Sequence, residues 1–364
     1  MPSGPPPSRV GQKDWRQLRY FATAVEGLGP ILAYEVGTLA GTEVEPRRQF
    51  DGRNDVVSFS AKRPDGLAGL RTSEDVFVEV SAARRVGTLR ALVGALRDDR
   101  ALEQALSVYS AQVRPLRARM TFRVVARVLS EREFPRTALR DELSRVIQQA
   151  RPRWRATDPA ALELWALEST PGRIRLGVRL SGSAMRHRGG RNLERPGALR
   201  PTVAAAMVLL AGTPTVRASA TLLDPCCGSG TIPAEAAAAG WIPLGADLDP
   251  GAVAVARANL GGTARLLLAD VRRLPLADAS VAALASNLPF ARQYTVQGSP
   301  GAWFAAALAE LDRVTQAPAA VVLLVPTTNA FQRALAGRPS LALERRLDLR
   351  LLGMRTALWQ LRRR

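Results

Sequence analysis

The chain of 364 residues has few of the side chains that build metal sites and disulfide frameworks. Its two cysteines, Cys226 and Cys227, are adjacent, and a disulfide between neighbours strains the peptide that joins them. Two cysteines and the single histidine, His187, cannot supply the four ligands of an ordinary zinc site. These shortages argue against a disulfide-stabilised scaffold and against a structural zinc domain.

Long apolar runs are also missing from the sequence. No run approaches the roughly 20 residues that a helix needs to span a bilayer. The first fifteen residues, "MPSGPPPSRVGQKDW", have no apolar central stretch of the kind found in secretory signals. We therefore expect a cytoplasmic protein without membrane contact, with a disordered leader over residues 1–15. Since 47% of the residues are apolar, the rest of the chain should fold.

Lysine is scarce, and arginine carries nearly all of the formal charge of +19. A GC-rich genome accounts for the choice of arginine over lysine, but not for the excess of positive charge. That excess favours a polyanionic partner. It is uneven, because residues 1–200 hold 35 basic and 22 acidic side chains, against 16 and 10 in residues 201–364. If a nucleic acid binds, the first part should supply most of the contacts.

The first half of the chain has an α+β pattern. Residues 16–85 predict a strand and a helix followed by two alternating strands. Residues 86–185 predict a strand, an amphipathic helix and a hairpin. On the last strand of that hairpin, Arg173, Arg175 and Arg179 alternate with apolar residues, which places their charges on one face.

The second half alternates strands with helices. Residues 186–212 form an arginine-rich connector that ends in a short apolar helix. Beyond it we predict helices between the first five of seven strands, at 221–224, 242–248, 264–270, 281–287, 319–326, 343–351 and 356–362. This alternation indicates a parallel, doubly wound sheet with helices on both faces. Such sheets bind ligands at the carboxyl ends of their strands.

The stretch "DPCCGSGT" links the first of these strands to a helix. Asp224 closes the strand, and Gly228 and Gly230 permit a sharp turn that leaves no side chain in the way. Ser229 and Thr231 bring hydroxyls to the helix start, where free amides point outward. Without a lysine this is not a phosphate-binding loop. Glycine turns of this kind also serve nicotinamide and flavin cofactors, and some bind nothing.

Acidic residues follow the next two strands. Asp247, 23 residues after Asp224, is placed to accept both ribose hydroxyls. Asp270 is placed to accept from an adenine amine, with the Val271 amide as a donor, and Asp249 should cap the next helix. A single aspartate at a strand end often does no more than cap a helix. Three at successive strand ends, beside a glycine turn, predict a nucleoside site.

The fourth strand ends in "SNLPF", which predicts a second, amine-binding part of the same site. Asn287 offers a side-chain carbonyl that can accept a hydrogen bond from an exocyclic amine. Pro289 stiffens the turn, and Phe290 offers a flat face on which a base can stack. Asn and Pro also occur where an ordinary strand passes into a loop. The amine-site interpretation therefore depends on the position of this stretch at the end of the fourth strand, in register with the glycine turn.

In this order, "DPCCGSGT", "GADLDPGAVAVARAN", "LLLADVRRLPL" and "NLPF" resemble the motifs of class I S-adenosylmethionine-dependent methyltransferases that act on amino groups. The family pattern at the fourth strand is (N/D/S)-P-P-(Y/F/W), and Leu288 replaces its first proline. Upstream, "RYFATAVEGLGPILAYEV", "LRTSEDVFVEV", "FPRTALRDELSRVI" and "RHRGGRNLERPGALRPTVAAAMVLLAG" are similar to the THUMP-domain RNA methyltransferases. The resemblance covers about residues 18–362.

The resemblance implies an architecture and an activity. It implies a ferredoxin-like domain at 16–85, a THUMP RNA-binding domain at 86–185 and a linker with a connecting helix at 186–212. A Rossmann-like class I methyltransferase domain with a seven-stranded, mostly parallel sheet would fill 213–364. The cofactor would be S-adenosyl-L-methionine, with no metal. The methyl group would go to the exocyclic N2 amine of a guanosine, in the acceptor stem of tRNA or alternatively in 23S rRNA.

The resemblance also implies roles for individual residues. The amine site would consist of Asn287, Leu288, through its backbone carbonyl, Pro289 and Phe290. The cofactor would contact Asp224, Pro225, Cys226, Gly228, Ser229, Gly230, Thr231, Asp247, Leu248, Asp270 and Val271. Connector arginines would contact RNA phosphates, with solvated linker charge as the alternative reading, namely Arg186, Arg188, Arg191 and Arg200.

Other classes of function remain open at this point. A non-catalytic RNA-binding protein could keep the methyltransferase fold. Methylation of amino groups in DNA or protein would use the same catalytic turn but leaves the basic first half unexplained, although DNA could also use that charge. A nicotinamide dehydrogenase would need a proton-relay residue beside the glycine turn, and we find none. We expect RNA, most plainly tRNA, as the partner of a monomeric enzyme.

Overall fold

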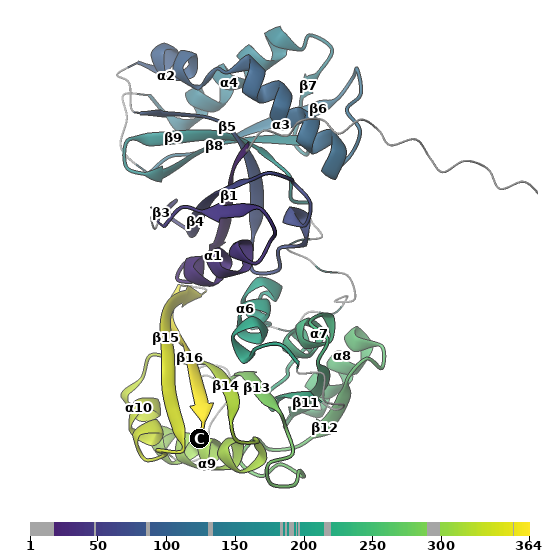
Figure 1. Ribbon diagram of the computed structural model, residues 1–364, viewed down its shortest axis with the longest axis vertical. Coiled ribbons are helices and arrows are strands. Elements are labelled where there is room, and N and C mark those ends of the chain that lie inside the picture. The colour runs from purple at the N-terminus through teal and green to yellow at the C-terminus, as the bar shows by residue number, and fades with distance from the viewer. Residues whose placement is uncertain are drawn as a thin grey trace, which may run out of the picture.

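The computed structural model describes the chain in two halves (Figure 1). Its described residues are 18–46, 49–84, 88–129, 134–182, 185, 188, 193, 195, 197–214, 220–289, 299–351 and 353–364. The predicted leader, residues 1–15, lies outside them. The N-terminal half, purple to teal in the figure, and the C-terminal half, teal-green to yellow, each contain one large sheet.

The N-terminal half is built on a nine-stranded sheet. Its strands are β1 (Leu18–Val25), β2 (Thr42–Val44), β3 (Gln49–Phe50), β4 (Asn54–Ala61), β5 (Asp75–Arg84), β6 (Thr121–Arg127), β7 (Arg155–Ala156), β8 (Leu162–Thr170) and β9 (Arg173–Arg179). They are arranged in the order β2-β4-β1-β5-β9-β8-β6-β7, with β3 paired to β4. Because β5 pairs antiparallel with β9, the segments 16–85 and 86–185 share this sheet. Their division into two domains stays a prediction.

The helices of this half are α1 (Gly29–Gly37), the 3-10 helix η1 (Leu67–Gly69), α2 (Leu89–Leu96), α3 (Asp99–Gln112) and α4 (Arg136–Ala150). The sequence analysis did not predict α2 and α3. Both carry an ordinary start signal, because the side chains of Thr88 and Asp98 accept hydrogen bonds from backbone amides three residues on. The caps were therefore present in the sequence and were overlooked.

Two of the three arginines predicted on one face of β9, Arg175 and Arg179, are engaged within the fold. Arg175 is only 2% exposed, donates to Gln49 at 2.6 Å and pairs with Glu79 at 3.3 Å. Arg179 donates to Asp75 at 2.7 Å. A charge is taken out of water only where it finds a partner. These two arginines therefore hold the sheet together and are not free to bind a polyanion.

The C-terminal half contains the predicted seven-stranded sheet. Its strands are β10 (Thr221–Asp224), β11 (Ile242–Asp247), β12 (Arg265–Leu268), β13 (Ala283–Asn287), β14 (Ala319–Pro326), β15 (Leu341–Leu351) and β16 (Met354–Arg363). The order is β12-β11-β10-β13-β14-β16-β15, and β16 alone runs in the direction opposite to the other six strands. The expectation of a mostly parallel Rossmann-like sheet is confirmed. The strand order reverses between β10 and β13, which is where such sheets bind ligands.

The helices of this half are α6 (Pro201–Ala211), α7 (Thr231–Ala238), α8 (Pro250–Leu260), α9 (Pro300–Val314) and α10 (Asn329–Ala336). Helices were predicted in all four connections between the first five strands. That expectation is wrong for residues 269–282 between β12 and β13, which form turns. Pro275 lacks the amide that a helix needs there, and Ala279 has a left-handed backbone with φ of 48°.

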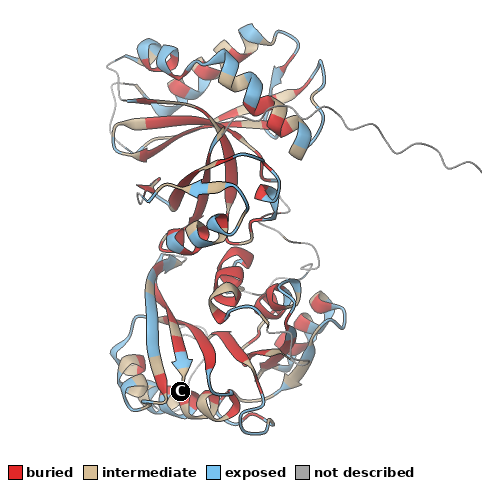
Figure 2. Cartoon of the chain, viewed as in Figure 1, coloured by how far each residue is buried: buried red, intermediate tan, exposed pale blue. Residues whose placement is uncertain are grey.

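Helix α6 joins the two halves (Figure 2). Nine of its eleven residues are buried, and its apolar side chains belong to a cluster that contains residues of β1 and of β14. A second contact lies at Gly27, whose φ is 95°. A Cβ at this glycine would lie 2.2 Å from the carbonyl oxygen of Asp348 in β15. The two halves therefore pack directly on each other.

Candidate functional site

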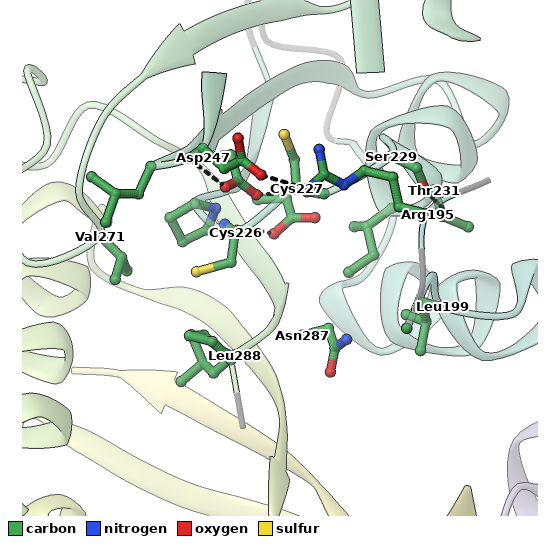
Figure 3. Close-up of a pocket in the computed structure, with 18 of the residues that line it drawn as sticks. Arg195, Leu199, Cys226, Cys227, Ser229, Thr231, Asp247, Val271, Asn287 and Leu288 are labelled. Atoms are coloured by element: carbon green, nitrogen blue, oxygen red, sulfur yellow. Dashed lines mark hydrogen bonds and ion pairs between the residues drawn. The ribbon is translucent and has the colours of Figure 1, made fainter. Parts of the chain in front are cut away.

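A cavity of about 730 Å³ opens at the carboxyl ends of the parallel strands (Figure 3). Most residues predicted to contact a cofactor line it, namely Asp224, Pro225, Cys226, Gly228, Ser229, Thr231, Asp247, Leu248, Asp270 and Val271. Three of the four predicted amine-site residues, Asn287, Leu288 and Pro289, line it as well. Phe290 lies outside the described residues, so its place in the site stays a prediction.

The glycine turn uses its two glycines for different purposes. Gly228 has φ of 53°, and its amide donates to the Asp247 carboxylate at 2.8 Å. Gly230, with φ of 86°, is the N-cap of α7, and a Cβ there would lie 2.9 Å from the Leu260 side chain. Gly230 thus allows α7 to pack closely on α8, and it is not among the residues that line the cavity. Its predicted contact with a cofactor has no direct support from this position.

Asp224 is a buried carboxyl group at the floor of the site. It is 2% exposed, and one of its oxygens accepts from the Ser286 hydroxyl at 2.7 Å and from the Cys226 amide at 3.1 Å. Burial raises the pKa of Asp224 to about 7, and the nearby Asp247 charge adds to this, whereas the two hydrogen bonds oppose it. Near neutral pH this group is poised to ionise when a cation is placed beside it.

The other two strand-end carboxylates are anchored differently. Asp247 accepts from the amides of Gly228 and Asp249, the latter at 3.0 Å. Asp249 accepts from the Gly251 amide and caps α8, as predicted. Hydrogen bonds from Arg272 lower the pKa of Asp270, which therefore stays ionised. Both Asp247 and Asp270 keep a place in the wall of the cavity.

Asn287 and Leu288 form the opposite side of the cavity in Figure 3. The side-chain oxygen of Asn287 is buried and accepts no hydrogen bond from the part of the chain that the structure describes. The Leu288 amide donates to the Leu324 carbonyl at 3.1 Å and extends the ladder between β13 and β14. A proline at 288 could not make this bond. Leucine therefore fixes the backbone by a hydrogen bond where the family pattern uses a rigid ring.

The two cysteines of the turn are not suited to nucleophilic chemistry. Burial raises the pKa of both thiols, and the Asp224 charge adds to the effect. A thiol with a raised pKa is a poor nucleophile. Cys227 packs with Ala256 and Leu260, and Cys226 lines the cavity. Both behave as small apolar residues beside the site.

The connector arginines are engaged to different extents. Arg188 pairs with Glu235 and donates to the carbonyl of Arg71, so its guanidinium is held inside the protein. An RNA contact through Arg188 is therefore not what this geometry favours. Arg200 keeps 55% of its side chain exposed and lies 3.6 Å from Glu74. Arg186 and Arg191 lie outside the described residues.

The sequence analysis missed part of the cavity wall. The additional lining residues are Arg195, Gly197, Ala198, Leu199, Cys227, Ile232, Asp249, Arg272 and Trp303. The connector contributes the first four, and Arg195 pairs with Asp249. Asn259 fixes the connector further by donating to the carbonyls of Leu193 and Ser229, both at 2.9 Å. Proline and glycine in "RPGAL" suggested only a linker, and no local pattern shows that this segment crosses the strand ends.

None of the helices in the described part of the chain is both long and apolar enough to cross a membrane. No group of three or more His, Cys, Asp or Glu side chains in the described ranges is arranged to hold a metal ion.

The part of the chain that lines this cavity is similar to a known methyltransferase domain. Residues 188–347 match the family model of the RMKL-like methyltransferase domain, UPF0020. The chain is 36% identical over 135 residues to the U6 snRNA (guanine-N(2))-methyltransferase THUMPD2 of Mus musculus. The aligned region covers 35% of this chain and 24% of that protein. The Bos taurus protein of the same name is 35% identical over 135 residues, or 25% of its length. The match thus spans about a quarter of these relatives.

Solved structures resemble the chain over nearly its whole length. TrmN from Thermus thermophilus superposes with a TM-score of 0.74 at 22% identity, covering 95% of this chain and 100% of that one. A possible methylase from Clostridium difficile 630 gives 0.71 at 15% identity, covering 95% and 98%. At these identities the likeness shows a shared fold. The chain thus shares the fold of these proteins, and its residues 188–347 are similar to the RMKL-like methyltransferase domain.

Proposed function

We propose that the chain transfers a methyl group from S-adenosyl-L-methionine to the exocyclic N2 amine of a guanosine in RNA. The observation that carries this proposal is the buried side-chain oxygen of Asn287, which lacks a hydrogen-bond donor among the described residues. A buried acceptor without a partner costs about 1–3 kcal/mol. An exocyclic amine entering the cavity would supply the missing donor.

The cavity suits the proposed cofactor. Its volume of about 730 Å³ is within the usual range for small-molecule sites. Asp247 retains lone pairs for ribose hydroxyls beside its two amide contacts, and Asp270 with the Val271 amide can recognise the adenine edge. Asp224 offers a carboxylate to the cationic methionine portion. When bound, S-adenosylmethionine supplies a methyl group activated by its sulfonium.

The protein's part in the reaction is to position a weak nucleophile. A guanine amine reacts poorly because its lone pair is delocalised into the ring. The Asn287 side-chain oxygen and the Leu288 backbone carbonyl accept its two hydrogens, which orients the amine and raises the electron density on nitrogen. Burial of the Leu288 side chain and its amide bond to Leu324 keep that carbonyl in place. Pro289, and Phe290 as a stacking surface, complete the predicted amine site.

For the substrate we favour the acceptor stem of tRNA, with 23S rRNA as the alternative. The excess charge of residues 1–200 and the resemblance of the N-terminal half to THUMP-containing enzymes support an RNA held by that half. The relative THUMPD2 is named for guanine-N2 methylation of U6 snRNA, which supports the target atom but names a different RNA. We further propose that the enzyme is a cytoplasmic monomer with a separate N-terminal domain and THUMP domain.

The test is methyl transfer to defined RNA pools. Purified protein is incubated with labelled S-adenosylmethionine and either tRNA or 23S rRNA, and digested nucleosides are analysed by mass spectrometry. We expect N2-methylguanosine in tRNA. The Asn287→Ala variant should lose turnover by about a hundredfold or more while its RNA affinity is unchanged. Methylation of 23S rRNA alone supports the alternative substrate. RNA binding without affinity for the cofactor supports the non-catalytic reading.

A further inference from the structure

A buried carboxylate behind the glycine turn plays no part in the proposed chemistry. Glu235 lies in α7 and is 3% exposed. It follows Thr231, whose side chain lines the cavity, by four residues and therefore by about one helical turn. Removing an ionised carboxylate from water is costly unless cations meet it. The partners of Glu235 therefore indicate what it does.

Two guanidiniums from distant parts of the sequence meet at Glu235. Arg71, from the loop after η1, donates to one carboxylate oxygen through Nε at 2.9 Å and Nη2 at 2.7 Å. Arg188 of the connector pairs with the same oxygen. Arg188 also donates to the backbone carbonyl of Arg71. The N-terminal half, the connector and α7 thus meet in one ion cluster, which consists of Arg71, Arg188 and Glu235.

The loop that carries Arg71 is itself held in place by α1. The carboxylate of Glu35 accepts from the Arg71 amide at 2.6 Å and from the Thr72 amide at 2.9 Å. The Thr72 hydroxyl donates to the same carboxylate at 2.5 Å. With two backbone amides and the Thr72 hydroxyl held by Glu35, the loop presents Arg71 to Glu235 in a defined position.

On its other side, α7 carries the wall of the cavity. It has eight residues, and its start is the glycine turn that contributes Gly228, Ser229 and Thr231 to the lining. Gly230 packs within contact distance of Leu260, so α7 has little room to shift toward α8. A tilt of so short a helix would displace the turn and the hydroxyls at its N-terminal end.

We propose that Glu235 is a positioning residue for the cofactor site. Through its ion pairs with Arg71 and Arg188 it holds α7, and with it the glycine turn, in the orientation that receives the cofactor. This inference rests on the proposed function. Neutralising Glu235 leaves two guanidiniums facing each other without a counter-charge, so the cluster should open and α7 should lose its support.

Two variants test the proposal, and a third is a matched control. Glu235→Gln removes the charge at constant size, and Arg71→Met removes one partner whose side chain is 38% exposed. The control is Arg127→Met, which breaks the 2.6 Å ion pair with the buried Asp51 inside the N-terminal sheet and away from the cavity. Calorimetry measures the Kd for S-adenosylmethionine well below the thermal midpoint of each protein.

We expect Glu235→Gln to raise this Kd about tenfold, in line with the loss of supporting contacts behind other ligand sites. Arg71→Met should raise it severalfold. The double variant should be little worse than Glu235→Gln alone, because either change breaks the same cluster. Arg127→Met should lower the thermal midpoint and leave the Kd unchanged. Wild-type Kd values in both test variants, with lowered midpoints, would overturn the proposal and make the cluster purely structural.

A second measurement judges the inference separately from the proposed function. If the wild-type protein binds no S-adenosylmethionine, the proposed function fails. Hydrogen exchange of the amides in residues 227–234 is then compared in the unliganded proteins. Faster exchange in Arg71→Met and Glu235→Gln than in Arg127→Met supports the positioning role, and equal exchange rules it out. If Glu235→Gln does not fold, Arg71→Met decides both measurements.

Discussion

Two sets of buried polar groups, one in each half of this protein, differ in whether they meet a partner of opposite charge or a cavity. In the N-terminal sheet, Arg175, Arg179 and Asp51 lie inside the fold, and each meets partners of opposite charge. At the carboxyl ends of two central strands of the C-terminal sheet, Asp224 and Asn287 face a cavity. In the described part of the chain no cation pairs with Asp224, and no donor meets the side-chain oxygen of Asn287. Buried charge that is already paired maintains the fold, whereas buried polarity left facing a cavity marks a place for a ligand.

This contrast predicts that substitutions in the two sheets separate stability from binding. Removing a partner from the first sheet should destabilise the fold and leave cofactor affinity alone. Removing a polar group that faces the cavity of the C-terminal sheet should weaken cofactor binding and not destabilise the fold. The reason is that the unliganded protein gains no stability from a carboxyl group that it must bury.

The largest expected effect is on stability, in Arg175→Met. This change leaves Glu79 with only its 3.4 Å ion pair to Arg19 and takes the donor from Gln49, so we expect a loss of about 3 kcal/mol in the free energy of unfolding. Denaturant titration measures the loss, and the cofactor Kd of the folded fraction should be unchanged. As a control, Arg97→Met breaks an exposed pair with Asp99 and should leave the unfolding free energy nearly unaltered. Equal losses in the two variants would contradict the comparison.

The converse variant is Asp224→Asn at the cavity. It removes the carboxylate offered to the cationic part of the cofactor, so we expect the Kd to rise about a hundredfold, as for a charged hydrogen bond worth roughly 3 kcal/mol. Because the folded-state pKa of about 7 lies above the ordinary value of 3.8, ionised Asp224 opposes folding of the unliganded protein. Asp224→Asn should therefore be more stable than wild type at pH 8, as thermal unfolding can check. A loss of stability at that pH would argue against this reading of Asp224.

The same carboxyl group should make cofactor affinity depend on pH. With a pKa of about 7, the ionised fraction rises roughly tenfold between pH 6 and pH 8, and the Kd should fall by about that factor. The stability of the unliganded protein should change in the opposite direction. Protonated Asp224 contributes most to the free energy of unfolding below about pH 4, and this contribution is lost as the pH rises through 7. Ser286→Ala removes a hydrogen bond that lowers this pKa, so the midpoint should move to higher pH. An unmoved midpoint would assign the titration to another group.

The smallest expected effect is that of Leu288→Pro, which restores the first proline of the family pattern. It removes the amide bond to Leu324 and part of a buried side chain, which should cost about 2 kcal/mol of stability. The Leu288 carbonyl remains, so methyl transfer should fall less than tenfold when measured on folded protein. A hundredfold loss would show that the leucine side chain has a role in the site itself.

Local sequence patterns were enough to predict the sheet of the C-terminal half and most of its cavity. The glycine turn and the strand-end carboxylates lie within short, ordered motifs, and parallel strands bring their ends to one edge. Contacts between segments that are distant in the sequence could not be predicted. Ser286 meets Asp224 across 62 positions, and Arg71 meets Glu235 across 164. No spacing rule relates such pairs, and the same is true of the connector that closes one wall.

The almost completely buried α6 limits how the protein can be divided for experiments. A fragment that starts at residue 213 would lack this helix and leave the apolar surface that it covers on the C-terminal sheet open to water. A fragment that ends before residue 201 would also lack α6, and the apolar surface that this helix covers on the N-terminal half would be exposed. Either piece should self-associate, so studies of RNA recognition and of methyl transfer are best made on the undivided chain.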